Sequence, residues 1–102
     1  MTHINSFRDL TVWQVSMDLV DVCFEIVEAI PHPYRFTFTN QLIPAGISIP
    51  SKIAEGSRRP TKANINHVSY SLGSHGELET LFELIHRRRL VPEALLEARV
   101  IS

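Results

Sequence analysis

The stretch Ser48-Ile49-Pro50-Ser51-Lys52-Ile53-Ala54-Glu55-Gly56 decides the fold of this chain. Its apolar residues recur at helical spacing, yet Pro50 lies inside the pattern and Gly56 ends it. A proline inside a helix removes one backbone donor and clashes with the carbonyl group four residues earlier. The stretch therefore predicts a helix that is kinked at Pro50 and has Gly56 as its C-cap residue.

Upstream of this stretch, the same helix is expected to begin after Thr37, because threonine is a common N-cap residue. Pro31 and Pro33 act as helix breakers, so residues 31–36 are predicted to form a connector. A further proline, Pro44, lies within the predicted helix. Two short helices joined at a kink therefore remain an alternative to one continuous helix.

Residues 11–30 predict a helix with an unusually wide apolar surface. Thr11 and Gln14 have the spacing of a capping box at its start. A surface helix in a monomer has one apolar arc of about 100° or slightly more, whereas this segment has two adjacent apolar stripes. We therefore expect burial on two sides, in the core and against another subunit. The first apolar stripe is Trp13, Met17, Val20, Phe24 and Val27. The second apolar stripe is Val12, Val15, Leu19, Val22, Ile26 and Ile30. The polar stripe is Gln14, Asp18, Asp21, Glu25 and Glu28.

Two more helices are predicted after Gly56. Thr61 is a candidate N-cap for a helix from Lys62 to about Arg89, roughly 40 Å long at 1.5 Å per residue. Gly73 and Gly76 would each cost this helix about 1 kcal/mol relative to alanine, and close approach of another helix would offset that cost. Pro92 is expected at the first position of a short last helix.

These elements predict an all-α fold, namely an elongated up-and-down antiparallel four-helix bundle with a proline-kinked second helix and a short last helix. The chain has 102 residues, of which 44% are hydrophobic, so residues 1–102 are expected to form a single domain. A cytoplasmic location is predicted, because no apolar run approaches about 20 residues and no signal-peptide pattern is present. The single cysteine, Cys23, cannot form an internal disulfide.

Four segments of the chain are similar to a known family. They are Asp9-Leu10-Thr11-Val12-Trp13, Ser48 to Gly56, Gly73-Ser74 and Glu77-Leu78-Glu79, and they resemble the bacterial four-helix-bundle proteins also called 23S rRNA intervening-sequence proteins. The resemblance covers roughly residues 7–90. It implies an elongated four-helix bundle that assembles as a homopentamer around a central channel, in agreement with the double apolar surface of residues 11–30.

The resemblance also implies an association with RNA. Some members of the family are encoded inside insertions in large-subunit ribosomal RNA genes. The accessory proteins of diversity-generating retroelements share the fold and bind nucleic acid and a reverse transcriptase. In this chain, Ile43 and Pro44 stand where relatives commonly carry basic residues, which weakens the transfer of nucleic-acid binding to this helix.

Two clusters of basic residues are the candidate nucleic-acid-binding sites. Arg58, Arg59 and Lys62 surround the predicted start of the third helix, where free backbone N–H groups favour an anion. Near its end lies the run Arg87-Arg88-Arg89. The alternative interpretation is a solvated turn for the first cluster and cations that complement the helix dipole for the second.

Catalytic, metal-binding and cofactor-binding patterns are weak in this sequence. Glu83 and His86 form one E-x-x-H pair, whereas a di-iron bundle needs two such pairs and further inward-pointing glutamates. The serines and histidines have no nucleophile-elbow or other catalytic spacing, and no P-loop or dinucleotide fingerprint is present. We therefore expect a protein that is not an enzyme and has no metal site and no cofactor.

Two functions follow from these observations. The first is a non-enzymatic oligomeric bundle, expected to be a homopentamer, that acts as an accessory protein for structured RNA or for an RNA-bound protein. The second is a protein–protein scaffold ring that binds no nucleic acid and uses its acidic stripe and apolar edges. No membrane partner is expected.

Overall fold

A computed structural model of the chain describes residues 6–57 and 75–98. These residues are helical, and no strand occurs among them. The elements are a 3-10 helix η1 (Phe7–Asp9), the α-helices α1 (Thr11–Ala29), α2 (His32–Gly56) and α4 (Glu93–Leu96), and a helical segment over residues 75–87. The all-α class predicted from the sequence is confirmed for this part of the chain.

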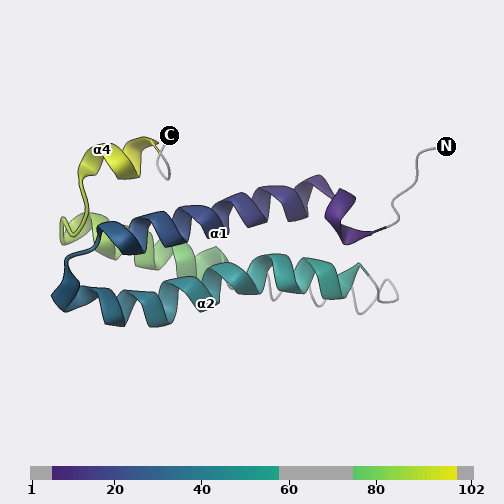
Figure 1. The fold of residues 1–102 in the computed structure, drawn as a ribbon, viewed down its shortest axis with the longest axis horizontal. Coiled ribbons are helices and arrows are strands. Elements are labelled where there is room, and N and C mark those ends of the chain that lie inside the picture. The colour runs from purple at the N-terminus through teal and green to yellow at the C-terminus, as the bar shows by residue number, and fades with distance from the viewer. Residues whose placement is uncertain (1–5, 58–74, 99–102) are drawn as a thin grey trace.

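Helix α1 and helix α2 pack side by side and run in opposite directions, and residues 75–87 run back along them (Figure 1). The molecule measures 47 × 26 × 20 Å, and its radius of gyration of 15.2 Å exceeds the value of about 13 Å expected for a compact chain of this length. The prediction of an elongated shape agrees with these dimensions. The complete up-and-down topology stays a prediction, because residues 58–74 fall outside the described part.

The core is a single apolar cluster to which α1, α2, residues 75–87 and α4 all contribute. Its members from α1 and α2 lie at helical spacing, so one stripe of each helix faces the partner. The fully buried side chains are Cys23, Ile26, Ile30, Leu42, Leu78, Ile85 and Leu96. This cluster holds the two long helices against residues 75–87 and fixes the end of the molecule that carries Arg87–Arg89.

Close approach between α1 and α2 depends on Gly46. A methyl group added at Gly46 would lie 3.0 Å from the Cys23 sulfur and 4.0 Å from a methyl group of Val20. Cys23 is fully buried at this contact, and burial raises the pKa of its thiol to about 11, although a backbone hydrogen bond partly offsets the increase. At neutral pH Cys23 is therefore a protonated thiol that acts as a small core residue.

Helix α2 begins earlier than the sequence predicted. Residues 31–36 were predicted to be a connector with Thr37 as N-cap, but α2 begins at His32, with Pro31 at the N-cap position. The prediction failed because a proline in the first helical turn is compatible with a helix, since its missing N–H would have had no partner there. As a result, Tyr34 and Phe36 lie on a helix rather than on a loop.

The interior prolines do not divide α2 into two helices. Helix α2 is continuous from His32 to Gly56 and contains both Pro44 and Pro50. A kink at these prolines stays a prediction. Gly56 is the last residue of the helix, and Ser57 in a right-handed helical conformation takes the C-cap position, so the prediction that Gly56 is the C-cap residue is wrong.

The start of α1 also differs from the prediction. Leu10 is the N-cap residue and makes no side-chain cap, so the Thr11–Gln14 capping box does not form. The side-chain amide of Gln14 instead donates a hydrogen bond of 3.0 Å to the carbonyl oxygen of Arg8 in η1. This change follows from η1, because its last residue Asp9 leaves only Leu10 between the two helices.

An aromatic contact attaches η1 to α1. The rings of Phe7 and Trp13 meet edge to face, with 5.3 Å between their centroids, and the guanidinium group of Arg8 lies over the Phe7 ring. Trp13 therefore has a structural role, since it anchors η1 to the first turn of α1.

The prediction for α1 as a doubly apolar helix is supported in part. Val22, Ile26 and Val27 are buried in the core, whereas Phe24 is 48% exposed and Val15 is 60% exposed. The acidic residues of the polar stripe are all exposed: Asp18, Asp21, Glu25 and Glu28. Within one chain, part of each apolar stripe of α1 therefore faces solvent. Among the helices of the described residues, none is long and apolar enough to cross a membrane.

Candidate nucleic-acid interface

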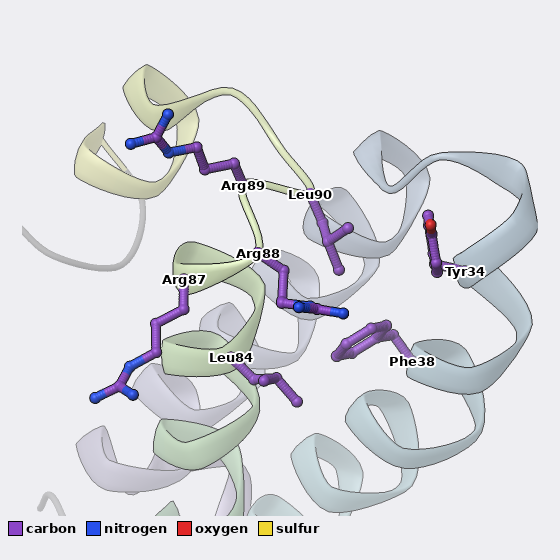
Figure 2. Close-up of a pocket in the computed structure, with 7 residues that line it drawn as sticks. All are labelled: Tyr34, Phe38, Leu84, Arg87, Arg88, Arg89 and Leu90. Atoms are coloured by element: carbon purple, nitrogen blue, oxygen red, sulfur yellow. The ribbon is translucent and has the colours of Figure 1, made fainter.

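The candidate site lies at one end of the molecule, where residues 75–87 end close to the start of α2 (Figure 2). The predicted residues Arg87, Arg88 and Arg89 lie at this end, and their side chains point in three different directions. The other predicted cluster, Arg58, Arg59 and Lys62, lies outside the described residues.

The three arginines occupy a defined helix ending. The N–H of Leu90 donates to the carbonyl of Ile85 at 3.1 Å, and the N–H of Arg89 donates to the carbonyl of His86 at 3.1 Å. These two bonds, together with a φ of 52° at Arg89, form a Schellman motif with Arg89 at the C′ position. Glycine is favoured there because the left-handed conformation costs other residues about 1 kcal/mol. The sequence thus retains an arginine at a position that disfavours it.

The three guanidinium groups have different surroundings. The Nε atom of Arg87 donates a hydrogen bond of 3.1 Å to Glu83, one helical turn earlier, and both side chains are exposed. Among the described residues, Arg88 and Arg89 have no ion pair. Two positive charges at this end of the molecule are therefore available for an anion.

A pocket of about 650 Å³ opens between these arginines and α2. Its lining residues are Tyr34, Phe38, Leu84, Arg87, Arg88, Arg89 and Leu90. Arg88 extends across the pocket toward Phe38, whereas Arg87 points away from it (Figure 2). No carboxylate is among the lining residues, so the pocket combines aromatic surface with the positive charges of Arg88 and Arg89, which have no ion pair among the described residues.

Tyr34 lies in residues 31–36, which the sequence predicted to be a connector, so its place in this pocket was not predicted. Tyr34 is 53% exposed and Phe38 is buried, and both come from the first turns of α2. The available signal was the pair of prolines at positions 31 and 33, because proline in a first helical turn marks a helix start.

Arg35, a further basic residue near this end, has a structural role instead. The guanidinium group of Arg35 donates three hydrogen bonds to backbone carbonyls at the end of α1: 3.1 Å and 3.0 Å to Ile30, and 3.2 Å to Glu28. These carbonyls lack helical partners because they lie in the last turn of α1. Arg35 therefore caps α1 from α2, and its charge is not available to a ligand in the same way as that of Arg88.

The sequence matches the model of a known protein family. A family model described as 23S rRNA-intervening sequence protein matches residues 8–99. The chain belongs to this family. The resemblance stated from the sequence motifs is thereby confirmed, and the family name associates these proteins with ribosomal RNA. No curated protein matches the chain at a significant level.

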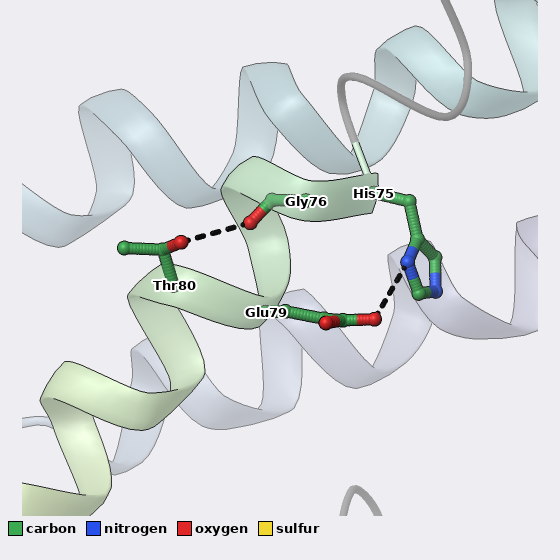
Figure 3. Close-up of polar contacts among 4 residues, drawn as sticks. All are labelled: His75, Gly76, Glu79 and Thr80. Carbon is green, nitrogen blue, oxygen red and sulfur yellow. Dashed lines mark hydrogen bonds and ion pairs between the residues drawn. The ribbon is translucent and has the colours of Figure 1, made fainter. Parts of the chain in front are cut away.

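In this member of the 23S rRNA-intervening sequence protein family, the residues of the weak metal pattern have protein partners. Glu83 accepts from Arg87, and His86 lies 3.6 Å from the carboxylate of Glu93. His75 and Glu79 form a pair at 3.0 Å, next to a bond of 2.9 Å from the Thr80 hydroxyl to the Gly76 carbonyl (Figure 3). Among the described residues, no three His, Cys, Asp or Glu side chains form a group that could hold a metal ion.

Proposed function

We propose that this protein is a non-enzymatic, homo-oligomeric helical protein that binds structured RNA through the end carrying Arg87, Arg88 and Arg89. The observation that carries the proposal is the position of Arg89. An arginine at a left-handed helix C′ position lowers stability relative to glycine, and such local strain is typical of residues retained for binding.

The charge distribution supports an anionic partner at this end. Arg88 and Arg89 form no ion pair within the described residues, and no carboxylate lines the pocket beside them. Guanidinium groups bind phosphates with paired hydrogen bonds, which makes arginine well suited to an RNA backbone. In an oligomer the same cluster would recur in each copy, so the positive fields would add.

A salt series tests the RNA part of the proposal. We expect a structured RNA to bind the wild-type protein with an affinity that falls steeply with salt, since each neutralised phosphate contributes a slope of roughly −0.7 on single strands and roughly −0.9 on a B-form duplex. The variant Arg89→Gly should reduce the slope by about 1. The same variant should raise the free energy of unfolding by about 1 kcal/mol, because glycine tolerates the left-handed conformation.

The control is Arg8→Ala, which removes an exposed arginine from η1 at the other end of α1 and should leave the salt slope unchanged. If Arg89→Gly is more stable than the wild type but binds RNA more weakly, the loss of binding cannot result from unfolding. Absence of RNA binding at low salt, or an unchanged slope for Arg89→Gly, would contradict the proposal.

Self-association is supported by the exposed apolar residues of α1. Val12, Val15, Met17 and Phe24 are all exposed; Val12 and Val15 lie in the same stripe as the buried Val22 and Ile26, and Met17 and Phe24 belong to the neighbouring stripe. Exposed apolar surface of this kind is typical of interfaces between subunits. The homopentamer expected from the family resemblance would cover it.

Light scattering coupled to size exclusion tests this part of the proposal. We expect a particle of several times the 11.6 kDa chain mass, with five copies for a pentamer. The variant Phe24→Glu should dissociate the particle, because a carboxylate would be buried at the interface without a partner. The matched control Gln14→Glu adds the same charge on the polar stripe of α1 and should leave the mass unchanged. A wild-type monomer would refute the oligomer.

A protein scaffold is the second candidate function, and the exposed acidic stripe of α1 favours it. Asp18, Asp21, Glu25 and Glu28 are exposed, and the sequence has no lysine or arginine from Asp9 to Ile30. Such a surface suits a basic protein partner. Formation of the oligomer without any RNA binding would support the scaffold over the RNA-binding function.

A further inference from the structure

The pocket beside Arg88 has the composition of a site for one unpaired nucleotide. Its volume of about 650 Å³ lies within the range of about 300–1,000 Å³ typical of small-ligand sites. Tyr34 and Phe38 of α2 line one side, and Arg88 reaches in from the other, while Arg87 and Arg89 point away from the pocket (Figure 2). An aromatic surface opposite a guanidinium group matches a ligand with a flat ring and an attached phosphate.

Tyr34 is the residue placed to stack with such a ring. About half of its side chain is exposed, whereas Phe38 is buried and contributes the floor of the pocket. A base that is splayed out from RNA can stack on an aromatic side chain, but a base stacked within a duplex cannot enter a concave pocket. Each base stacked in this way contributes about 1–3 kcal/mol by alanine substitution.

Arg88 is the residue placed to bind the phosphate. Its side chain extends across the pocket toward Phe38, so its guanidinium group lies on the aromatic side, while Arg87 points away and pairs with Glu83 (Figure 2). The neighbouring pocket, in contrast, is lined by the carboxylates of Glu83 and Glu93 as well as by Arg87 and Arg89, so its positive charge is balanced. Charge complementarity therefore selects the Tyr34 side of the arginine cluster.

We propose that the pocket between α2 and Arg87–Arg89 binds a single unpaired nucleotide of a structured RNA, with its base against Tyr34 and its phosphate on Arg88. This inference rests on the proposed RNA-binding function and adds a preference for RNA loops and bulges over uninterrupted duplex. The pocket supplies contacts to a ring and a phosphate, so we expect the preference to depend on an unpaired nucleotide more than on its sequence.

The test compares two RNA probes, a hairpin with an unpaired loop and a blunt duplex with the same number of phosphates. We expect the wild-type protein to bind the hairpin at least about 5-fold more tightly, as one stacked base is worth about 1–3 kcal/mol. Tyr34→Ala should reduce hairpin binding to the level of the duplex and leave duplex binding unchanged. Arg88→Ala should weaken binding to both probes.

The matched control is Phe36→Ala, which removes another exposed aromatic side chain from the same helix but does not line the pocket. Its hairpin affinity should equal that of the wild type. Equal hairpin affinities for wild type and Tyr34→Ala would overturn the inference but leave the proposed function intact. No salt-dependent binding of either probe would overturn both. Binding of an acidic peptide as tightly as the hairpin would also overturn the inference, because it would indicate a protein ligand.

Discussion

Replacing Arg35 with alanine should lower the free energy of unfolding by about 2–3 kcal/mol. Arg35 donates three hydrogen bonds to the carbonyls of Glu28 and Ile30, and hydrogen bonds from charged groups contribute about 1.5–3 kcal/mol. Ile30 is fully buried, so its carbonyl would lose its partner in a poorly hydrated place. Arg35 also joins the end of α1 to α2, and this cross-link would be lost in the variant.

Denaturant unfolding at a fixed protein concentration measures this effect. Arg88→Ala is the matched control, because Arg88 has no ion pair in the described part of the chain and its loss should change stability by no more than about 0.5 kcal/mol. Arg35→Lys should be intermediate, since an ammonium group cannot reproduce the planar arrangement of guanidinium donors. Equal stability of Arg35→Ala and Arg88→Ala would contradict the capping role.

Replacing Gly46 with alanine should change the free energy of unfolding in opposite directions in the wild type and in a Cys23→Ala variant. In the wild type the new methyl group would lie 3.0 Å from the Cys23 sulfur, and we expect a loss of about 1 kcal/mol, because overpacking outweighs the gain in helix propensity. In a Cys23→Ala background the nearest atom becomes the β-carbon of residue 23, at 3.7 Å. There the same change should stabilise the protein by about 1 kcal/mol.

A double-mutant cycle from denaturant unfolding measures the coupling, which should be about 2 kcal/mol. Gly76→Ala is the control, because no described atom lies within 4 Å of the methyl group that it would add, and it should stabilise the protein in both backgrounds. A coupling near zero would show that α1 and α2 are not in close contact at Gly46. Within one chain no described residue approaches Gly76, so the close approach of another helix expected there stays a prediction.

Most of the helices could be predicted from local patterns. The apolar spacing of residues 11–30 predicted α1 within a residue of its observed end, and the exposed acidic stripe followed from the same spacing. The short last helix was also predicted after Val91, although Pro92 is its N-cap and Glu93 its first residue. These features depend on contacts three or four residues apart, which a sequence displays directly.

Helix boundaries were less predictable where two interpretations of one residue compete. Pro33 breaks a helix when it lies in the interior but suits a helix in the first turn. Thr11 is a good N-cap in isolation, yet η1 leaves that position to Leu10. The choice in each case depends on the packing of neighbouring segments, which local propensity does not contain.

The sequence by itself determined the all-α class, the family, the wide apolar surface of α1 and the presence of three consecutive arginines after His86. Only the tertiary structure decided what the basic residues contact. It placed Arg35 on the carbonyls of α1, Arg87 beside Glu83, and Arg88 across a pocket from Tyr34 and Phe38. Tyr34 and Arg88 are far apart in the chain, and they meet because residues 75–87, packed against α1 and α2 through the shared core, end beside the start of α2.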